Sequence, residues 1–243
     1  MFCWTEEMVH FMRDASRAGD YHRQLAAILK ARLDGAQHVC DAGCGLGFLS
    51  CRMAEQFPYV TAADVSETAL DVLRAQARQL QLSNLTVLQA DLTQYTPPEP
   101  FDAMVFCFYG RMQEILHIAK RCCRGRIAVI KKDYTHHRFS VSHVPLRDET
   151  ADQAAQLLRE RDIPFALEKF QFEMGQPFRS LEDAVRFFEI YSKDAPGALT
   201  QDAVRRRLRE TGDAEFPYYL PQEKKLGLLT LDTKDIPERE DLI

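Results

Sequence analysis

The chain has 243 residues, of which 46% are hydrophobic, 28% charged and 10% aromatic, and its formal net charge is −5. This composition is typical of a globular protein whose core needs no disulfide or metal, and the acidic balance argues against broad capture of nucleic acid or an anionic membrane. No apolar run approaches the roughly 20 residues that cross a bilayer, and the first residues lack the basic-then-apolar order of a secretory signal, so we expect a cytoplasmic protein.

Hydrophobic spacing predicts alternating helices and strands along the first two thirds of the chain. Residues 5–34 are expected to be helical, with a break near Gly19 and Asp20. Strands are then predicted over 37–41, 59–63, 85–90, 101–108 and 126–131. The helices predicted between and after them cover 48–56, 67–82, 112–123 and 150–162.

The last third of the chain predicts a different arrangement. Strands are expected over 166–173 and 225–231, paired antiparallel, with helices over 180–191 and 200–211 between them. Because strands that alternate with helices form parallel sheets covered on both faces, the sequence predicts an α/β protein with a doubly wound, mostly parallel sheet. We expect the N-terminal helices and a helical insertion before the last strand to flank this sheet.

The seven cysteines are expected to be buried, reduced thiols. Their number is odd, and several lie in apolar segments, where reduced cysteine behaves as a small hydrophobic residue. Cys40, Cys44 and Cys51 straddle a glycine turn, and no matching Cys/His pair completes a tetrahedral zinc set. The sequence therefore predicts no metal site.

The glycine turn Asp41-Ala42-Gly43-Cys44-Gly45-Leu46-Gly47 follows a predicted strand and opens a helix. Such a turn lets a ligand approach the backbone closely, and the helix start offers unpaired N–H groups. Asp64 ends the second predicted strand, where a carboxylate accepts ribose hydroxyls, and Asp91 follows the third, where an adenine amino group is read. The spacing therefore indicates a nucleoside site, although each aspartate on its own also fits a helix cap.

Two nucleoside ligands compete for this site. A dinucleotide fingerprint spaces its glycines as Gly-x-Gly-x-x-Gly, whereas Gly43, Gly45 and Gly47 alternate here. Asp41 beside the turn would repel a pyrophosphate, but it suits a ligand that carries an ammonium and a sulfonium. S-adenosylmethionine carries both, and NAD carries neither.

These segments resemble the class I S-adenosylmethionine-dependent methyltransferases. Asp41–Gly47 is similar to motif I of that family, Ala63–Ser66 to the acidic position after it, Ala90–Leu92 to the adenine-contacting position, and Phe101–Phe106 to the strand before the catalytic loop. The resemblance covers about residues 36–132. It implies a seven-stranded, Rossmann-like sheet whose last strand is antiparallel, with S-adenosylmethionine as cofactor and S-adenosylhomocysteine as product.

The resemblance also implies a role for individual residues. Gly43 and Gly45 would line the methionine part of the cofactor, and Asp64 would bind its ribose. The residues expected to flank the adenine are Val65, Asp91 and Leu92. Further cofactor contacts are expected from Asp41, Cys44, Cys107 and, in the segment before the sheet, Tyr21.

The sequence says less about the methyl acceptor. Cys107-Phe108-Tyr109-Gly110 stands where methyltransferases of adenine or glutamine carry Asn/Asp-Pro-Pro-Tyr. In the basic segment 131–138, which also fits a solvated surface, His136 or His137 would act as a base or bind an anionic group. Tyr109 is the third candidate catalytic residue. Aromatic residues of the insertion would wall off a pocket with the N-terminal helices: Phe178, Phe187, Phe188, Tyr191, Tyr218 and Tyr219.

We interpret the chain as a single methyltransferase domain. Its parts are an N-terminal helical cap over 1–35, a cofactor-binding core over 36–175, a helical insertion over 176–217, and the last strand and tail over 218–243. The leading hypothesis is methyl transfer to a small-molecule acceptor by in-line displacement, in a monomer or homodimer with no nucleic-acid or membrane partner. The alternatives are an RNA or protein methyltransferase and a non-catalytic S-adenosylmethionine-binding regulatory protein.

Overall fold

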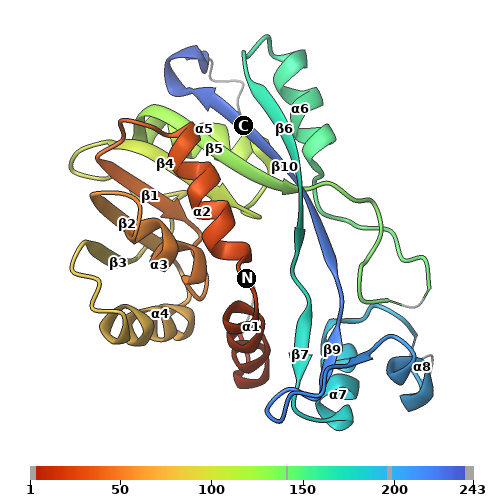
Figure 1. The fold of residues 1–243 in the computed structure, drawn as a ribbon. Helices are drawn as coiled ribbons and strands as arrows, with labels where there is room; N and C mark the ends of the chain where they lie inside the picture. Colours follow the sequence, from red (N-terminus) through yellow and green to blue (C-terminus); the bar gives the residue numbers. More distant parts are fainter. Residues whose placement is uncertain (1–3, 141, 196–198, 239–243) are drawn as a thin grey trace.

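The structure is a computed structural model that describes residues 4–140, 142–195 and 199–238. Its centre is a seven-stranded sheet with the strand order β3-β2-β1-β4-β5-β10-β6 (Figure 1). Strand β10 runs antiparallel to both of its neighbours, and the other neighbouring strands run parallel. The predicted doubly wound sheet with an antiparallel last strand is therefore confirmed. Its strands are β1 His38–Ala42, β2 Tyr59–Asp64, β3 Leu85–Gln89, β4 Phe101–Cys107, β5 Cys123–Lys132, β6 Ala166–Glu173 and β10 Glu223–Asp232.

Helices cover both faces of the sheet, which explains the continuously apolar sequence of β4. Ala103 and Val105 pack into the cluster under one set of helices, while Met104 and Phe106 pack into the cluster on the opposite face. All four are fully or almost fully buried. The first set comprises α2 Tyr21–Arg32, α3 Phe48–Ala54 and α4 Glu67–Gln79, and the opposite set comprises α5 Met112–Cys122 and α6 Ala151–Glu160.

Local chemistry fixes where these helices begin. Ser66 caps α4 by accepting a hydrogen bond from the backbone N–H of Ala69, and Thr150 forms a capping box with Gln153 at the start of α6. Gly47 precedes α3 with a φ of +72°, and a Cβ there would lie 2.2 Å from Cδ1 of Leu73. Only glycine fits that position, so the turn between β1 and α3 keeps its shape.

The insertion between β6 and β10 contains strands as well as helices. It carries β7 Gln176–Phe178, α7 Leu181–Tyr191, α8 Gln201–Arg205, β8 Arg209–Glu210 and β9 Tyr218–Leu220. The three short strands form a sheet of their own, in the order β7-β9-β8, beyond the ends of β6 and β10 (Figure 1). A short 3₁₀ helix, Thr233–Asp235, follows β10.

The predicted helix over 200–211 is wrong beyond Arg205, where α8 ends. Arg207 points inward, donates hydrogen bonds to the carbonyl oxygens of Phe139 and Arg138, and lies 4.5 Å from the centre of the Phe188 ring. Because these contacts turn the chain, Arg209 is free to pair with β9 instead of continuing the helix.

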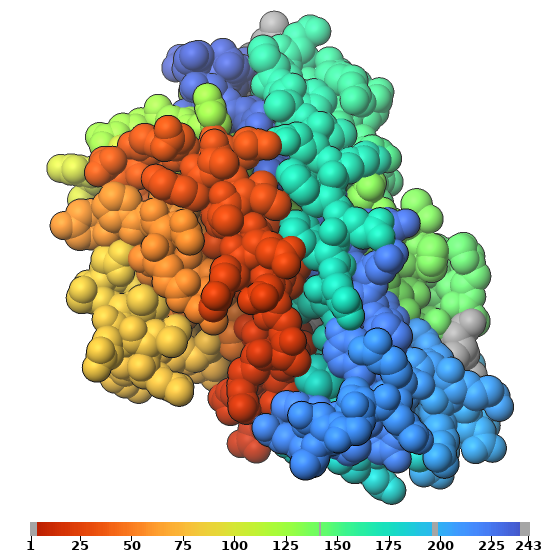
Figure 2. All heavy atoms as spheres, in the orientation of Figure 1, coloured from red at the N-terminus to blue at the C-terminus, as the bar shows by residue number. Residues whose placement is uncertain are grey.

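The N-terminal helix α1, Glu6–Ala18, packs against the insertion and ends at Gly19, close to the predicted break. The ring of Phe11 meets that of Phe187 edge-on at 5.3 Å, Arg179 pairs with buried Asp14, and Gln176 donates to the backbone oxygen of Phe11. Figure 2 shows the N-terminal segment lying between the core and the insertion. Within the described ranges, no helix is both long enough and apolar enough to span a bilayer.

Candidate functional site

A cavity of about 890 Å³ lies at the carboxyl ends of the parallel strands, and we call it the cofactor cleft. Every residue expected to contact the cofactor lies on its wall, and so does Tyr109. The expected contacts are Tyr21, Asp41, Gly43, Cys44, Gly45, Asp64, Val65, Asp91, Leu92 and Cys107. The sequence therefore identified one contiguous set of residues from elements far apart along the chain.

The glycine turn forms the floor of the cleft. The backbone N–H groups of Gly43 and Cys44 both donate to the carbonyl oxygen of Ala63, at 2.8 and 3.0 Å, which fastens the turn to β2. Gly43 has a φ of +69°, and a Cβ there would lie 2.4 Å from Cδ2 of Tyr109. The ring of Tyr109 thus closes over the turn, and glycine is required beneath it.

Two carboxylates at the strand ends are held by backbone donors. The Asp64 oxygens accept hydrogen bonds from the N–H groups of Gly45 and Ser66, both at 2.8 Å. One oxygen of Asp91 accepts from the backbone N–H and the hydroxyl of Thr93, and these bonds lower the pKa of Asp91. Both carboxylates line the cleft and keep further lone pairs, as a ribose or an adenine amino group requires.

Asp41 is the deepest acid of the cleft. It is 1% exposed and accepts a hydrogen bond of 2.5 Å from the Ser50 hydroxyl, and burial raises its pKa to about 6. The buried hydroxyl of Tyr21 also lies on this wall, and it has no hydrogen-bond partner among the described residues. A buried carboxylate and an unmet hydroxyl suit a ligand that brings a cation and hydrogen-bonding groups, as S-adenosylmethionine does.

A second cavity, of about 920 Å³, adjoins the cofactor cleft, and we call it the acceptor cavity. The two cavities share three lining residues, Met12, Phe108 and Lys224. The acceptor cavity lies between α1, the segment after β5 and the insertion. Of the aromatic residues expected to wall a pocket there, Phe187 and Tyr191 line it, whereas Phe178 and Phe188 are buried in the core of the insertion.

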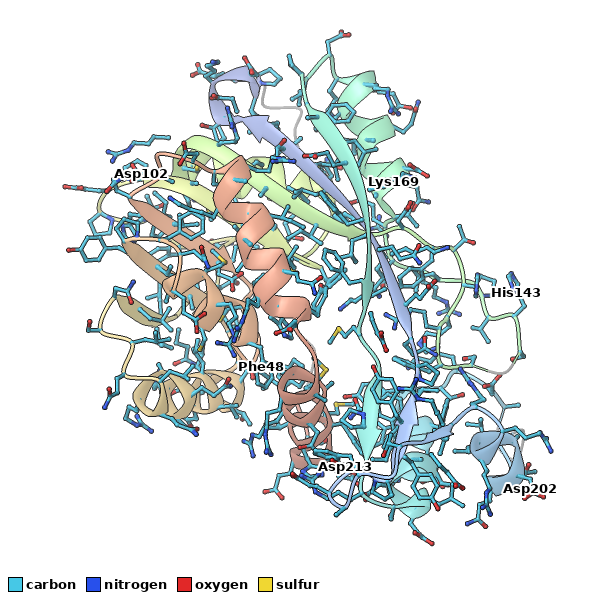
Figure 3. The ribbon with its side chains drawn as sticks, in the orientation of Figure 1. Phe48, Asp102, His143, Lys169, Asp202 and Asp213 are labelled. Atoms are coloured by element: carbon cyan, nitrogen blue, oxygen red, sulfur yellow. The ribbon has the colours of Figure 1, made fainter. Side chains whose placement is uncertain are left out.

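The three candidate catalytic residues lie in different places. His137 lines the acceptor cavity, where burial lowers its pKa and its Nδ1 lies 3.1 Å from the Ser140 hydroxyl. His136 lines neither cavity: its exposed ring lies 5.1 Å from that of His143, which Figure 3 shows on the outside of the loop after β5. Tyr109 lines the cofactor cleft, and burial raises the pKa of its phenol well above the usual range.

Lys224 on β10 was not identified from the sequence. Its Nζ lies 4.5 Å from the centres of both the Tyr21 and Phe108 rings, and burial lowers its pKa to about 7. Sequence patterns offer no signal for it, because it stands in a charged run before the last strand. Only the pairing of β10 with β5 and β6 brings it to the junction of the two cavities.

A buried ion pair holds the loop that carries Tyr109. Lys131, predicted to end a strand and to begin the basic segment, is 3% exposed within β5, and its Nζ lies 2.9 Å from Oε2 of Glu149. The same Nζ donates to the carbonyl oxygens of Tyr109 and Gly110. Lys131 is therefore a structural support of the cofactor cleft and has no access to a ligand.

The cysteines of the described ranges are all free thiols, and Cys3 lies outside those ranges. Cys40, Cys51, Cys122 and Cys123 are buried, as expected, whereas the half-buried Cys44 and Cys107 line the cofactor cleft. Burial raises the pKa of Cys107 to about 12, so it stays protonated at neutral pH. No group of three His, Cys, Asp or Glu side chains suited to a metal ion occurs among the described residues.

Residues 39–126 match the model of the methyltransferase domain family. An uncharacterized methyltransferase of Mycobacterium tuberculosis (strain ATCC 25618 / H37Rv) is 43% identical over 74 residues, which are 29% of this chain and 35% of that protein. (S)-coclaurine N-methyltransferase of Papaver somniferum is 35% identical over 75 residues, 30% of this chain and 21% of that protein. The chain thus matches about a third or less of the length of these relatives.

Solved structures share the fold over most of the chain. A candidate methyltransferase of Bacillus halodurans C-125 superposes with a TM-score of 0.53 at 17% identity, covering 88% of this chain and 99% of that one. Magnesium protoporphyrin IX methyltransferase of Synechocystis PCC 6803 with bound SAH gives a TM-score of 0.50 at 14% identity, with 94% and 89% covered.

The sheet order, the glycine turn and the three strand-end aspartates are the features expected of a class I S-adenosylmethionine-dependent methyltransferase domain. The methyltransferase domain family is matched over residues 39–126, the part of the chain that carries the glycine turn and the aspartates of the cofactor cleft.

Proposed function

We propose that the chain transfers a methyl group from S-adenosylmethionine, bound in the cofactor cleft, to a small molecule in the acceptor cavity. The observation that carries this proposal is the junction of the two cavities at Met12, Phe108 and Lys224. When bound, the cofactor supplies an electrophilic methyl group on a sulfonium. A cavity of this size suits a small-molecule ligand, and relatives named for coclaurine and magnesium protoporphyrin IX lend support.

The proposal gives each acid of the cleft a separate task. Asp41 pairs with the ammonium of the cofactor, Asp64 accepts from its ribose hydroxyls, and Asp91 accepts from the adenine amino group. Tyr21 closes the wall near the junction, and α1 covers it through Met12. By fixing both reactants and excluding water, these residues supply the positioning that an in-line displacement needs.

Lys224 is the residue proposed to receive the proton of a hydroxyl or amine acceptor. Of the described residues that line both cavities, it is the one with a titratable side chain. With a pKa near 7, much of its amine is uncharged at neutral pH, whereas the phenol of Tyr109 stays protonated. His137 lies in the same cavity and is the second candidate base, but it does not line the cofactor cleft.

The acceptor-dependent release of S-adenosylhomocysteine tests this proposal. Purified protein is incubated with methyl-labelled S-adenosylmethionine and a panel of small hydroxyl, amine, thiol and carboxylate acceptors. We expect one acceptor class to take up label, and Asp64→Asn to abolish most of the transfer, while Asp34→Asn at an exposed position leaves it unchanged. Cofactor binding with no transfer to any class would instead favour the regulatory alternative.

A further inference from the structure

The two adjoining cavities carry opposite charge. The cofactor cleft is lined by four carboxylates and one lysine: Asp41, Asp64, Asp91, Glu114 and Lys224. The acceptor cavity is lined by five lysine or arginine side chains and one aspartate: Lys132, Arg138, Arg147, Lys193, Lys224 and Asp148. The whole chain has a net charge of −5, so this gathering of positive charge runs against the overall balance.

Among the described residues, one of these cations forms an ion pair, and Lys224 is partly uncharged because burial lowers its pKa to about 7. Lys132 forms an ion pair with Asp148, the one acid among the described residues of the cavity wall. Arg138 is partly buried and donates from Nε to the side-chain oxygen of Gln222 at 3.3 Å. Its guanidinium also lies 5.4 Å from the centre of the Phe139 ring, and among the described residues it has no carboxylate partner. A partly buried guanidinium without a counter-charge favours an anionic ligand.

A buried hydroxyl with no hydrogen-bond partner among the described residues also indicates a ligand in this cavity. Tyr191 lines the cavity from α7, and its buried oxygen has no hydrogen-bond partner within the described ranges. Leaving a buried hydroxyl unpaired costs free energy, which a ligand oxygen would recover. Tyr191 and Arg138 both contact the ring of Phe139, at 5.9 and 5.4 Å, so they flank the same part of the wall.

The remainder of the wall is apolar. Aromatic rings and flexible methionines face the cavity, and the latter adapt to irregular shapes. These residues are Met8, Met12, Phe108, Phe139, Met174, Phe187 and Ile190. They suit a ligand with a hydrophobic, ring-sized body.

We infer that the acceptor cavity binds a small molecule that combines an apolar, ring-containing body with an anionic group, a carboxylate or a phosphate, held near Arg138 and Tyr191. This inference rests on the proposed function, because it names the class of methyl acceptor. The same charge arrangement keeps the two ligands apart. The acidic cofactor cleft repels the anionic acceptor, and the basic acceptor cavity repels the cationic cofactor.

Three probes with one aromatic body test the inference: 2-naphthoate, 2-naphthyl phosphate and the neutral 2-naphthalenemethanol. Each is titrated into the protein with S-adenosylhomocysteine present, after the affinity for S-adenosylhomocysteine has itself been measured. We expect at least one anion to bind ten times more tightly than the alcohol. Whichever anion binds more tightly shows whether the cavity prefers a carboxylate or a phosphate.

Variants locate the anion. Arg138→Gln is expected to remove most of the preference for the anion, whereas Arg138→Lys should keep part of it. Arg78→Gln, at an exposed position of α4, is the control and should change nothing. Tyr191→Phe removes an unpaired hydroxyl, so it leaves the fold intact and weakens anion binding alone. Equal binding of the alcohol and both anions, or a preference that survives Arg138→Gln and Tyr191→Phe, overturns the inference. Failure of S-adenosylhomocysteine to bind would instead overturn the proposed function.

Discussion

Replacement of Lys224 by methionine tests the coupling between the two cavities. The pKa of Lys224 is lowered to about 7, chiefly by burial, and its amine borders the cleft proposed to hold a sulfonium. The titratable and charged groups around it are Tyr21 and His22 of α2, Cys107 of β4, Lys132 of β5 and Arg138. None of these groups is a carboxylate, and the Cys107 thiol stays protonated at neutral pH, so none of them offsets the repulsion between a protonated Lys224 and a sulfonium.

The size of the expected change in S-adenosylmethionine affinity follows from the fraction of Lys224 whose amine is uncharged. If S-adenosylmethionine binds the form with neutral Lys224, its apparent Kd is divided by that fraction, which rises from about 0.1 at pH 6 to about 0.9 at pH 8 for a pKa near 7. The affinity for S-adenosylmethionine should therefore increase about tenfold over this range. S-adenosylhomocysteine has no sulfonium, so its affinity should change less. Asp41, with a pKa of about 6, affects both ligands alike through their shared ammonium.

The assay is calorimetric titration of both ligands at pH 6, 7 and 8. The wild-type ratio of the two Kd values should shift about tenfold with pH, and the ratio in Lys224→Met should stay constant. A ratio independent of pH in the wild type, or the same shift in the variant, would refute the assignment of Lys224 to the cofactor junction.

Three further predictions concern stability and the support of the cleft. Folding lowers the pKa of Lys224, so burial of its charged form destabilises the protein fully below about pH 7 and progressively less as the pH rises towards 10.5. Lys224→Met should therefore raise the free energy of unfolding by about 1–3 kcal/mol near pH 6 and by much less near pH 10. Urea denaturation at the two pH values measures both changes. Gly43→Ala should cost about 1–2 kcal/mol and weaken S-adenosylhomocysteine binding, because φ is +69° and the added Cβ meets Tyr109; thermal melts in which the variant equals the wild type would contradict this. Lys131→Met should cost about 3–5 kcal/mol because it leaves Glu149 unpaired, and Lys131→Met combined with Glu149→Leu should recover most of that loss in the same melts.

The main sheet could be predicted from sequence because its signals are local. β4 is almost continuously apolar, and the turn at Asp41–Gly47 places three glycines between a strand and a helix, as a nucleoside-binding turn does. The cofactor cleft followed from the same signals, since parallel strands bring their carboxyl ends to one edge. Asp64 and Asp91 lie there as expected.

A pocket between the N-terminal helices and the insertion was predicted, but most of its lining was not, because contacts between distant segments build the cavity. Arg207 belongs to the basic run 205–209, whose sequence predicts the solvent-exposed face of a helix. In the structure it packs on the ring of Phe188 and donates hydrogen bonds to the backbone of Arg138 and Phe139. Lys224 is far from α2 in the sequence, and only strand pairing carries it to Tyr21. His136 and His137 are adjacent in the sequence, but only His137 lines a cavity.

Calorimetric titration of the wild-type protein with S-adenosylmethionine, S-adenosylhomocysteine and NAD would establish which ligand the cofactor cleft binds. We expect micromolar binding of the first two, no binding of NAD, and a loss of about 1–3 kcal/mol in binding free energy for Asp64→Asn. Binding of NAD, or no binding of either adenosyl ligand by a folded protein, would contradict the assignment of the cleft at the glycine turn.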